Sequence, residues 1–151
     1  MNPLLPHLLA ESAGLEEYLA LLAEEERAMA DGRFKELPAL TARKAALQER
    51  MAELDQQREA AQRARGFAAG RAGADAAAGA GGEAACAAWA TLLGLAERAK
   101  AANRRNAAMV FGHLDFTQNA LRFLRDSGQM FYGPDGARKA PGGAGTRLAL
   151  G

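Results

Sequence analysis

The chain is poor in cysteine, in aromatic residues and in net charge. Cys86 is the only cysteine among 151 residues, so an internal disulfide framework is excluded and a reducing compartment is favoured. Aromatic residues make up only 6%, which predicts small side chains buried along helix seams rather than a thick core. A net charge of +1 gives no strong attraction to nucleic acid or to an anionic membrane.

Long apolar runs are missing as well. No run approaches the ~20 apolar residues that a membrane-spanning helix needs. Residues 1–7 contain no basic region, and acidic residues soon follow, so this segment does not have the features of a signal peptide. We therefore expect a cytoplasmic protein without membrane insertion.

No group of residues indicates an enzyme. His7, His113 and Cys86 have no spacing typical of a metal site, and structural zinc needs about four ligands. His113 on a helix seam is typical of a core or interface histidine. The carboxylates of residues 24–26 point in different directions around a helix, which does not suit acid–base catalysis. We expect no catalytic activity, no cofactor and no metal.

Apolar residues recur at alternating steps of three and four in three segments, as in helices that pack along a seam. The first segment, about 6–30, carries Leu8, Leu15, Leu19, Leu22 and Met29. The second, about 35–65, carries two heptad rows: Leu40, Leu47 and Leu54, and Leu37, Lys44 and Met51. The third, about 83–127, carries Trp89, Leu92, Ala96, Ala99, Asn103, Asn106, Val110, His113, Thr117, Leu121 and Leu124.

These segments predict an all-α fold and its organisation. The short break at Asp31-Gly32 predicts an antiparallel coiled-coil hairpin, with the long third helix completing an elongated three-helix bundle. The Ala- and Gly-rich segment 66–82 is expected to be a flexible linker, with a possible helical turn at 74–78. We expect a helical domain at 1–128, closed by Gly128, and a docking motif with a disordered tail at 129–151.

Two asparagines lie on the apolar seam of the third segment. A buried amide costs stability unless it finds a partner, and one that finds a partner fixes helix register. Asn103 and Asn106 therefore either set the register of this helix or hold the backbone of a bound partner.

The last turns of the third segment carry a second apolar row, Met109, Phe116 and Phe123, beside the seam. Together the two rows span about half of the helix circumference. Either two helices of the same chain cover this width, or part of it is exposed as a groove for a partner. We predict that an amphipathic segment of a partner binds here, on Met109, Phe116, Leu121, Phe123 and Leu124.

A turn with a defined chemistry follows the third segment. In Tyr132-Gly133-Pro134-Asp135-Gly136, the proline fixes φ, the aspartate bonds its own backbone, and the last glycine supplies a positive φ. One aromatic residue held on such a turn suggests a docking element, because nothing near it offers catalytic chemistry.

A heptad hairpin, a long third helix with Asn-x-x-Asn on its seam, and then Tyr-Gly-x-Asp-Gly resemble the FlgN family of flagellar type III export chaperones. The resemblance covers residues 8–136. Its most specific parts are Asn103-Arg104-Arg105-Asn106 and the Tyr132–Gly136 turn.

The resemblance implies a helical cytoplasmic protein that binds the C-terminal segments of the hook–filament junction proteins FlgK and FlgL before export. It also implies docking of the loaded chaperone on the cytoplasmic domain of the export gate protein FlhA. By residue match, the docking role falls on Tyr132, with Gly133, Asp135 and Gly136 shaping its turn.

A second class of function fits the same heptads. A structural coiled-coil protein that self-assembles through its leucine rows would show them too, although it needs neither the 66–82 segment nor the tail turn. Binding to a FlgK C-terminal peptide distinguishes the two classes.

Overall fold

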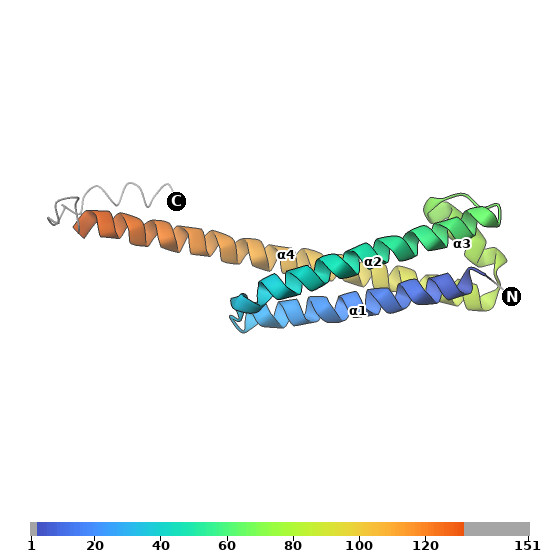
Figure 1. Cartoon of the computed structure of the whole chain (residues 1–151), viewed down its shortest axis with the longest axis horizontal. Helices are drawn as coiled ribbons and strands as arrows, with labels where there is room; N and C mark the ends of the chain where they lie inside the picture. The colour runs from blue at the N-terminus through green and yellow to red at the C-terminus, as the bar shows by residue number, and fades with distance from the viewer. Residues whose placement is uncertain (1–2, 132–151) are drawn as a thin grey trace. The chain divides into compact units, whose positions relative to one another are not determined.

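The computed structural model describes residues 3–131, and the side chains of residues 3–127. Its elements are α1 (Leu5–Ala30), the 3-10 turn η1 (Phe34–Glu36), α2 (Leu37–Ala64), α3 (Gly70–Ala80) and α4 (Glu83–Phe131) (Figure 1). No strand occurs within residues 3–131, so the expected all-α class is confirmed. The chain divides into two compact units, residues 1–106 and residues 107–151, which are described separately.

Helices α1 and α2 form an antiparallel hairpin. Polar pairs join them along their length: Glu24–Arg43 and Glu25–Lys44 near the turn, then Tyr18–Gln48, then Glu11–Arg58. From the turn outward, the residue number on α2 rises while the number on α1 falls. The two ribbons run side by side in opposite directions (Figure 1). The predicted hairpin is therefore present in the first unit.

The turn between α1 and α2 is closed by Gly32. Its φ of +71° lies in the left-handed region, and Gly32 N–H donates to the Met29 carbonyl at 3.2 Å while Arg33 N–H donates to the Ala28 carbonyl at 2.7 Å. This pair of bonds satisfies the last carbonyls of α1 and reverses the chain. The predicted left-handed cap is confirmed.

The core of the first unit is built mainly from α1 and α4. Its buried members on α1 are Leu8, Leu15, Tyr18 and Leu22, with Leu4 just before the helix, and those on α4 are Ala85, Ala88, Leu92, Leu95 and Ala99. Leu47, Met51 and Ala61 of α2 pack against this cluster. Small alanines on α4 let the helices approach closely, as the low aromatic content predicts.

The expectation of a flexible linker at 66–82 is wrong for residues 70–80, which form α3. Alanine has the strongest helix propensity, and Ala74, Ala77 and Ala78 are at most 2% exposed, so burial outweighs the cost of the glycines. Gly73 lies so close to the chain before α3 that a Cβ atom would meet the Ala68 carbonyl oxygen at 1.6 Å. Glycine at this position is therefore required for the close approach.

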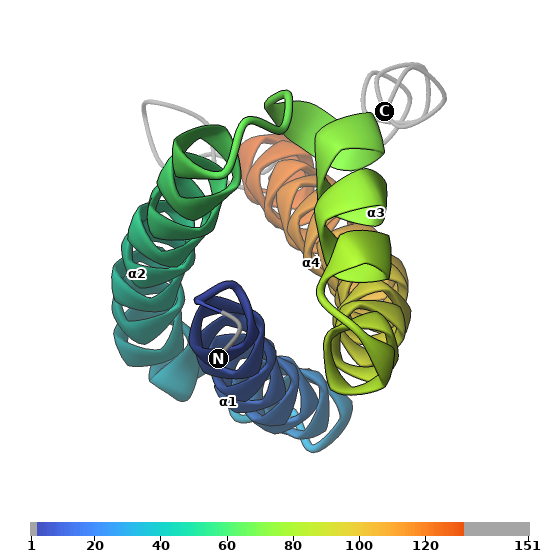
Figure 2. The same ribbon diagram turned by 90° about the vertical axis from the view of Figure 1, so that its right-hand side faces the viewer.

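Polar contacts fasten α3 to α2 and α4. Gly70 N–H donates to a Glu59 carboxylate oxygen at 3.2 Å, and the Trp89 indole N–H donates to an Asp75 carboxylate oxygen at 2.6 Å. Viewed end-on, α3 lies beside the beginning of α4 (Figure 2). These contacts explain why a segment rich in Gly and Ala holds one position.

A charged cluster crosses the interior near this end of the hairpin. Arg58 is 6% exposed; its Nε donates to Glu11 Oε1 at 2.6 Å, and its other nitrogens donate to Gln62 and Asp55. The guanidinium carbon lies 5.3 Å from the centre of the Trp89 ring. Burial raises the pKa of Glu11 to about 7, although the positive charge of Arg58 acts in the opposite direction.

The raised pKa of Glu11 predicts how stability changes with pH. Between its ordinary pKa of 4.5 and about 7, the folded chain keeps a proton that the unfolded chain has lost. The free energy of unfolding should therefore fall as pH rises through this window, by about 3 kcal/mol from this group. Glu11→Gln should remove that part of the pH dependence in urea unfolding measured from pH 5 to 8.

Glu16→Gln is the matched control, because Glu16 is an exposed glutamate of the same helix. It should keep the wild-type dependence on pH. An equal slope in wild type and Glu11→Gln would show that the Glu11 carboxylate titrates normally in the fold.

Helix α4 continues beyond the expected end at Gly128, as far as Phe131 (Figure 1). One glycine inside a helix costs only about 1 kcal/mol relative to alanine, so Gly128 does not stop it. The tail expected to be disordered and the turn at 132–136 lie outside the described residues.

Candidate functional site

Asn106 is the last residue of the first unit and its side chain is 1% exposed. Its Nδ2 donates to the Leu22 carbonyl oxygen at 2.8 Å and to Glu25 Oε1 at 2.9 Å. A buried amide with two partners on α1 fixes where α4 stands along that helix. The structure thus gives Asn106 an internal partner, which favours the register role over the holding of a partner's backbone.

Three helices meet at the carboxylate of Glu25. This side chain is 6% exposed and forms an ion pair with the Lys44 ammonium of α2 at 3.2 Å. It also accepts the hydrogen bond from the Asn106 amide of α4. Lys44 interrupts an otherwise apolar heptad row, and that interruption was the sequence signal for a buried ionic contact. The sequence did not identify Glu25 as its partner.

Asn106→Ala should lower the free energy of unfolding by about 1–3 kcal/mol. The substitution leaves a buried carbonyl without its donor and removes one partner of a buried carboxylate. Chemical unfolding measures the change. Asn103→Ala is the matched control: Asn103 lies three residues earlier and is half-buried, and its side chain makes no hydrogen bond within the described residues. Equal losses in both variants would exclude a register role specific to Asn106.

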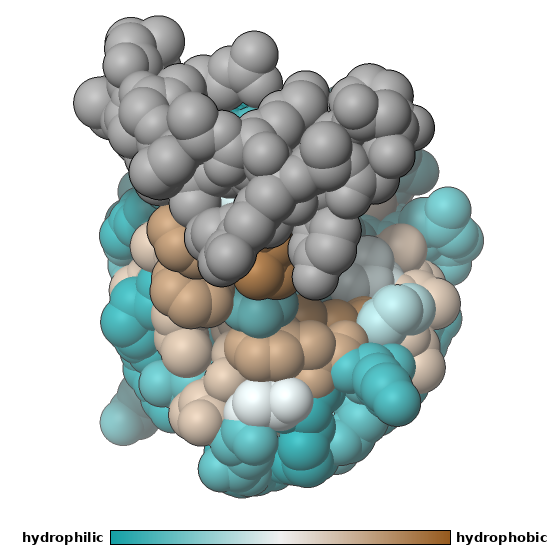
Figure 3. Space-filling model, turned by 90° about the vertical axis from the view of Figure 1, so that its left-hand side faces the viewer, coloured by the Kyte–Doolittle hydropathy of each residue, from teal (hydrophilic) through white to brown (hydrophobic). Residues whose placement is uncertain are grey.

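Beyond Asn106 the large apolar side chains of α4 are exposed. Among the described residues, six of the seven large exposed apolar side chains lie between residues 111 and 124: Phe111, Leu114, Phe116, Leu121, Phe123 and Leu124. Seen from one end, the surface of the described residues carries brown hydrophobic side chains as well as teal hydrophilic ones (Figure 3). An exposed apolar group of this size is typical of an interaction site.

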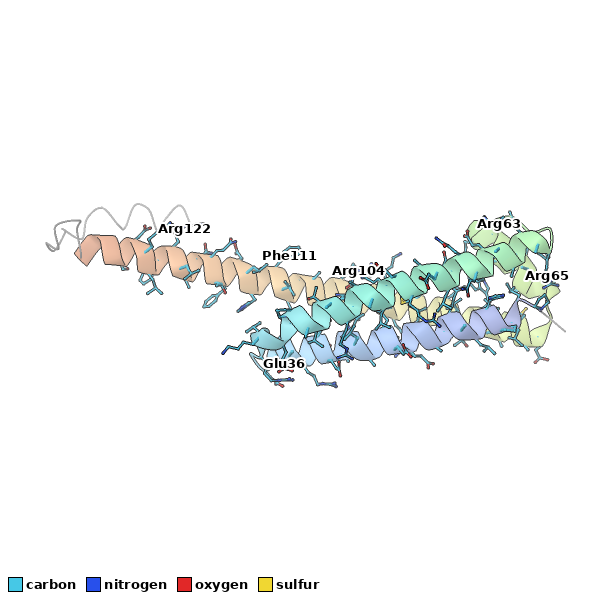
Figure 4. All side chains as sticks on the ribbon, in the orientation of Figure 1. Glu36, Arg63, Arg65, Arg104, Phe111 and Arg122 are labelled. Atoms are coloured by element: carbon cyan, nitrogen blue, oxygen red, sulfur yellow. The ribbon has the colours of Figure 1, made fainter. Side chains whose placement is uncertain are left out.

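The exposed residues gather on one half of the helix. At 100° per residue, the rows through Met109 and Val110, with Leu114 and Leu121, span about half of the circumference. Phe111 lies outside this half. Figure 4 shows it on the same side of α4 as Arg122, in agreement with the helical spacing. We call the half-circumference face from Met109 to Leu124 the apolar face.

All five residues predicted to bind a client lie on the apolar face. Phe116 is 72% exposed, Leu121 62%, Phe123 50% and Leu124 64%, and Met109 is half-buried. The alternative that helices of the same chain cover the whole width does not hold for the described residues. Leu114, which is 49% exposed, belongs to the same face but was not among the predicted site residues, although its position two turns before Leu121 was a usable signal.

The described residues meet neither the requirements of a metal site nor those of a membrane-spanning helix. No group of three or more His, Cys, Asp or Glu side chains there is placed to hold a metal ion. Cys86 is exposed, and its Sγ lies 3.3 Å from the Ala78 carbonyl oxygen. Within residues 3–131, no helix is both long and apolar enough to cross a membrane.

Comparison with protein families gives a decisive match. The family model described as FlgN protein matches residues 1–140, which is nearly the whole chain. The chain belongs to the FlgN family. FlgN proteins are chaperones of flagellar export, so the resemblance found in the sequence is confirmed and the apolar face lies on a chaperone. No curated protein and no solved structure matches the chain significantly.

The family match also includes the turn at Tyr132–Gly136, which lies outside the described residues. The docking role of Tyr132, Gly133, Asp135 and Gly136 therefore stays a prediction.

Proposed function

We propose that this FlgN-family chain is a cytoplasmic, non-enzymatic export chaperone. It binds the C-terminal segments of FlgK and FlgL and delivers them to the cytoplasmic domain of FlhA. The observation that carries the proposal is the exposed apolar face of α4, with Phe116 72% and Leu124 64% exposed. A client segment that packs on these side chains removes the apolar face of α4 and its own apolar side chains from water.

The physical chemistry of the face suits a segment that folds on binding. Each large apolar side chain that becomes buried contributes about 1.5–3 kcal/mol. Several such side chains offset the cost of ordering a flexible client segment. An amphipathic helix whose apolar side chains recur every three or four residues matches the spacing of the face.

Calorimetric titration of the purified chain with a FlgK C-terminal peptide tests the proposal. We expect a stoichiometric complex. Concentration-dependent oligomers of the chain, without peptide binding, would favour the self-assembling coiled-coil protein instead.

Docking on the export gate is assigned to the tail and is separable from client binding. An aromatic residue on a short rigid turn loses little freedom on binding, and its ring and hydroxyl fill a pocket and make one polar contact. Tyr132→Ala should therefore leave helicity and FlgK-peptide affinity unchanged but abolish co-purification of the loaded complex with the FlhA cytoplasmic domain.

The conservative variant Tyr132→Phe separates the contribution of the ring from that of the hydroxyl. It should retain part of the gate binding. If Tyr132→Ala loses the client and keeps the gate, the tail belongs to the client site and the division of roles is reversed.

A further inference from the structure

The apolar face consists of two seams rather than one. The first seam is Met109, His113, Phe116, Ala120 and Phe123, and the second is Val110, Leu114, Thr117, Leu121 and Leu124. Each has the alternating steps of four and three along which two helices pack. The second seam repeats the first one residue later, so the two seams point about 100° apart around the helix.

The earlier part of α4 shows how one of these seams is covered. The first seam, extended backwards in heptads, runs through Ala85, Ala88, Leu92, Leu95, Ala99 and Ala102, all in the core cluster with the α1 leucines. One seam of this helix is thus buried mainly by one partner helix.

The second seam is apolar only beyond Asn106. Extended backwards, it runs through Cys86, Trp89, Leu93, Ala96, Lys100 and Asn103. Cys86 and Lys100 are exposed, and the Trp89 indole donates a hydrogen bond to Asp75. Beyond Asn106, by contrast, Thr117 is the one polar residue among the five residues of the second seam, and three of its four apolar residues are large and exposed.

Both seams are uncovered at once. Phe116 and Phe123 represent the first seam and Leu114, Leu121 and Leu124 the second, and each of the five is about half exposed or more. A single client helix packed on one seam leaves the side chains of the other in water. Two helices, one on each seam, bury the whole face.

The outer edges of the two seams differ in charge. Leu121 lines a surface hollow together with Gln118, Arg122 and Arg125, so the edge of the second seam is basic. Arg122 and Arg125 have no ion pair within the described residues. The edge of the first seam carries Gly112, Asn119 and, one heptad further, Asp126, and it has no basic residue in this row. The second seam therefore suits a helix with acidic residues beside its apolar stripe.

We propose that the apolar face binds two amphipathic helices of a single client segment, one on each seam, and that the helix on the second seam presents acidic side chains to Arg122 and Arg125. The inference rests on the proposed chaperone function and specifies the form in which the client is held. Two helices in one chain bind more tightly than either alone, because the second helix binds intramolecularly once the first is in place.

The test uses the full chain, a FlgK C-terminal fragment and the two halves of that fragment. Four variants are titrated by calorimetry: Phe116→Ala with Phe123→Ala for the first seam, Leu114→Ala with Leu121→Ala for the second, Arg122→Gln with Arg125→Gln for its basic edge, and Leu9→Ala as the control. Leu9 is a large apolar residue of α1 that is 56% exposed and lies on neither seam nor on their edges. Far-UV circular dichroism checks that each variant remains helical.

We expect the whole fragment to bind one to one and to lose at least tenfold in affinity with either seam variant, but not with Leu9→Ala. One half should be sensitive only to the first-seam variant. The other half should be sensitive only to the second-seam variant, to Arg122→Gln with Arg125→Gln, and to added salt.

Four outcomes would overturn the inference. If the whole fragment is unaffected by Leu114→Ala with Leu121→Ala, the client uses one seam, and the proposed function still stands. Two fragments bound per chain, or second-seam variants that abolish only self-association, would contradict a single two-helix client. If the wild type binds no fragment, the proposed function fails together with the inference.

Discussion

Phe116→Ala combined with Phe123→Ala is expected to weaken binding of a FlgK C-terminal fragment at least tenfold. Both rings are exposed in the free chain, and burial of a side chain of this size contributes about 1.5–3 kcal/mol. A tenfold loss corresponds to about 1.4 kcal/mol, so even partial burial of the two rings in the complex suffices.

The same double variant should leave the fold intact. Truncation of an exposed ring creates no cavity, and alanine has a higher helix propensity than phenylalanine. Far-UV circular dichroism and thermal unfolding should therefore match the wild type. Leu9→Ala, at 56% exposure on α1 and away from the apolar face, is the control and should keep full affinity. Full binding by the double variant would refute the assignment of the client site.

Arg58→Met is expected to lower the free energy of unfolding by about 3 kcal/mol. The substitution leaves the largely buried Glu11 carboxylate without its partner at 2.6 Å and removes the donor that satisfies the fully buried Gln62 carbonyl oxygen. Breaking a buried ion pair from one side is costly because the remaining charge has lost both water and partner. Urea unfolding at pH 8, where Glu11 is mostly ionised, measures the loss.

Arg63→Met is the matched control on the same helix. The Arg63 side chain is 59% exposed and lies 3.9 Å from the Glu59 carboxylate, a contact one helical turn away. Exposed pairs of this kind contribute at most about 1 kcal/mol. Glu11→Gln added to Arg58→Met should restore part of the stability, because an amide costs less to bury than a carboxylate. Equal stability of wild type and Arg58→Met would show that the cluster contributes nothing.

Periodicity in the sequence predicted the position of the apolar face on its helix but not its exposure. The spacing of Met109, Phe116 and Phe123 predicted a row on one side of a helix, and that follows from local geometry. The sequence left open whether helices of the same chain cover the row, because periodicity is the same for a buried and an exposed stripe. Exposure in the folded chain decided this for residues 109–124.

The sequence by itself determined the helices, the hairpin and the family. These follow from heptad spacing, from Gly32 after α1 and from motifs such as Asn103–Asn106, all of which act within a few residues of chain. Tertiary structure alone decided that residues 70–80 fold as α3, that Asn106 and Lys44 meet at Glu25, and that Arg58 joins Glu11 and Trp89. Such contacts depend on which residues, distant in sequence, come together in the water-free interior of the fold. There the burial of small alanines stabilises a helix such as α3, and a buried charge is costly unless it has a partner.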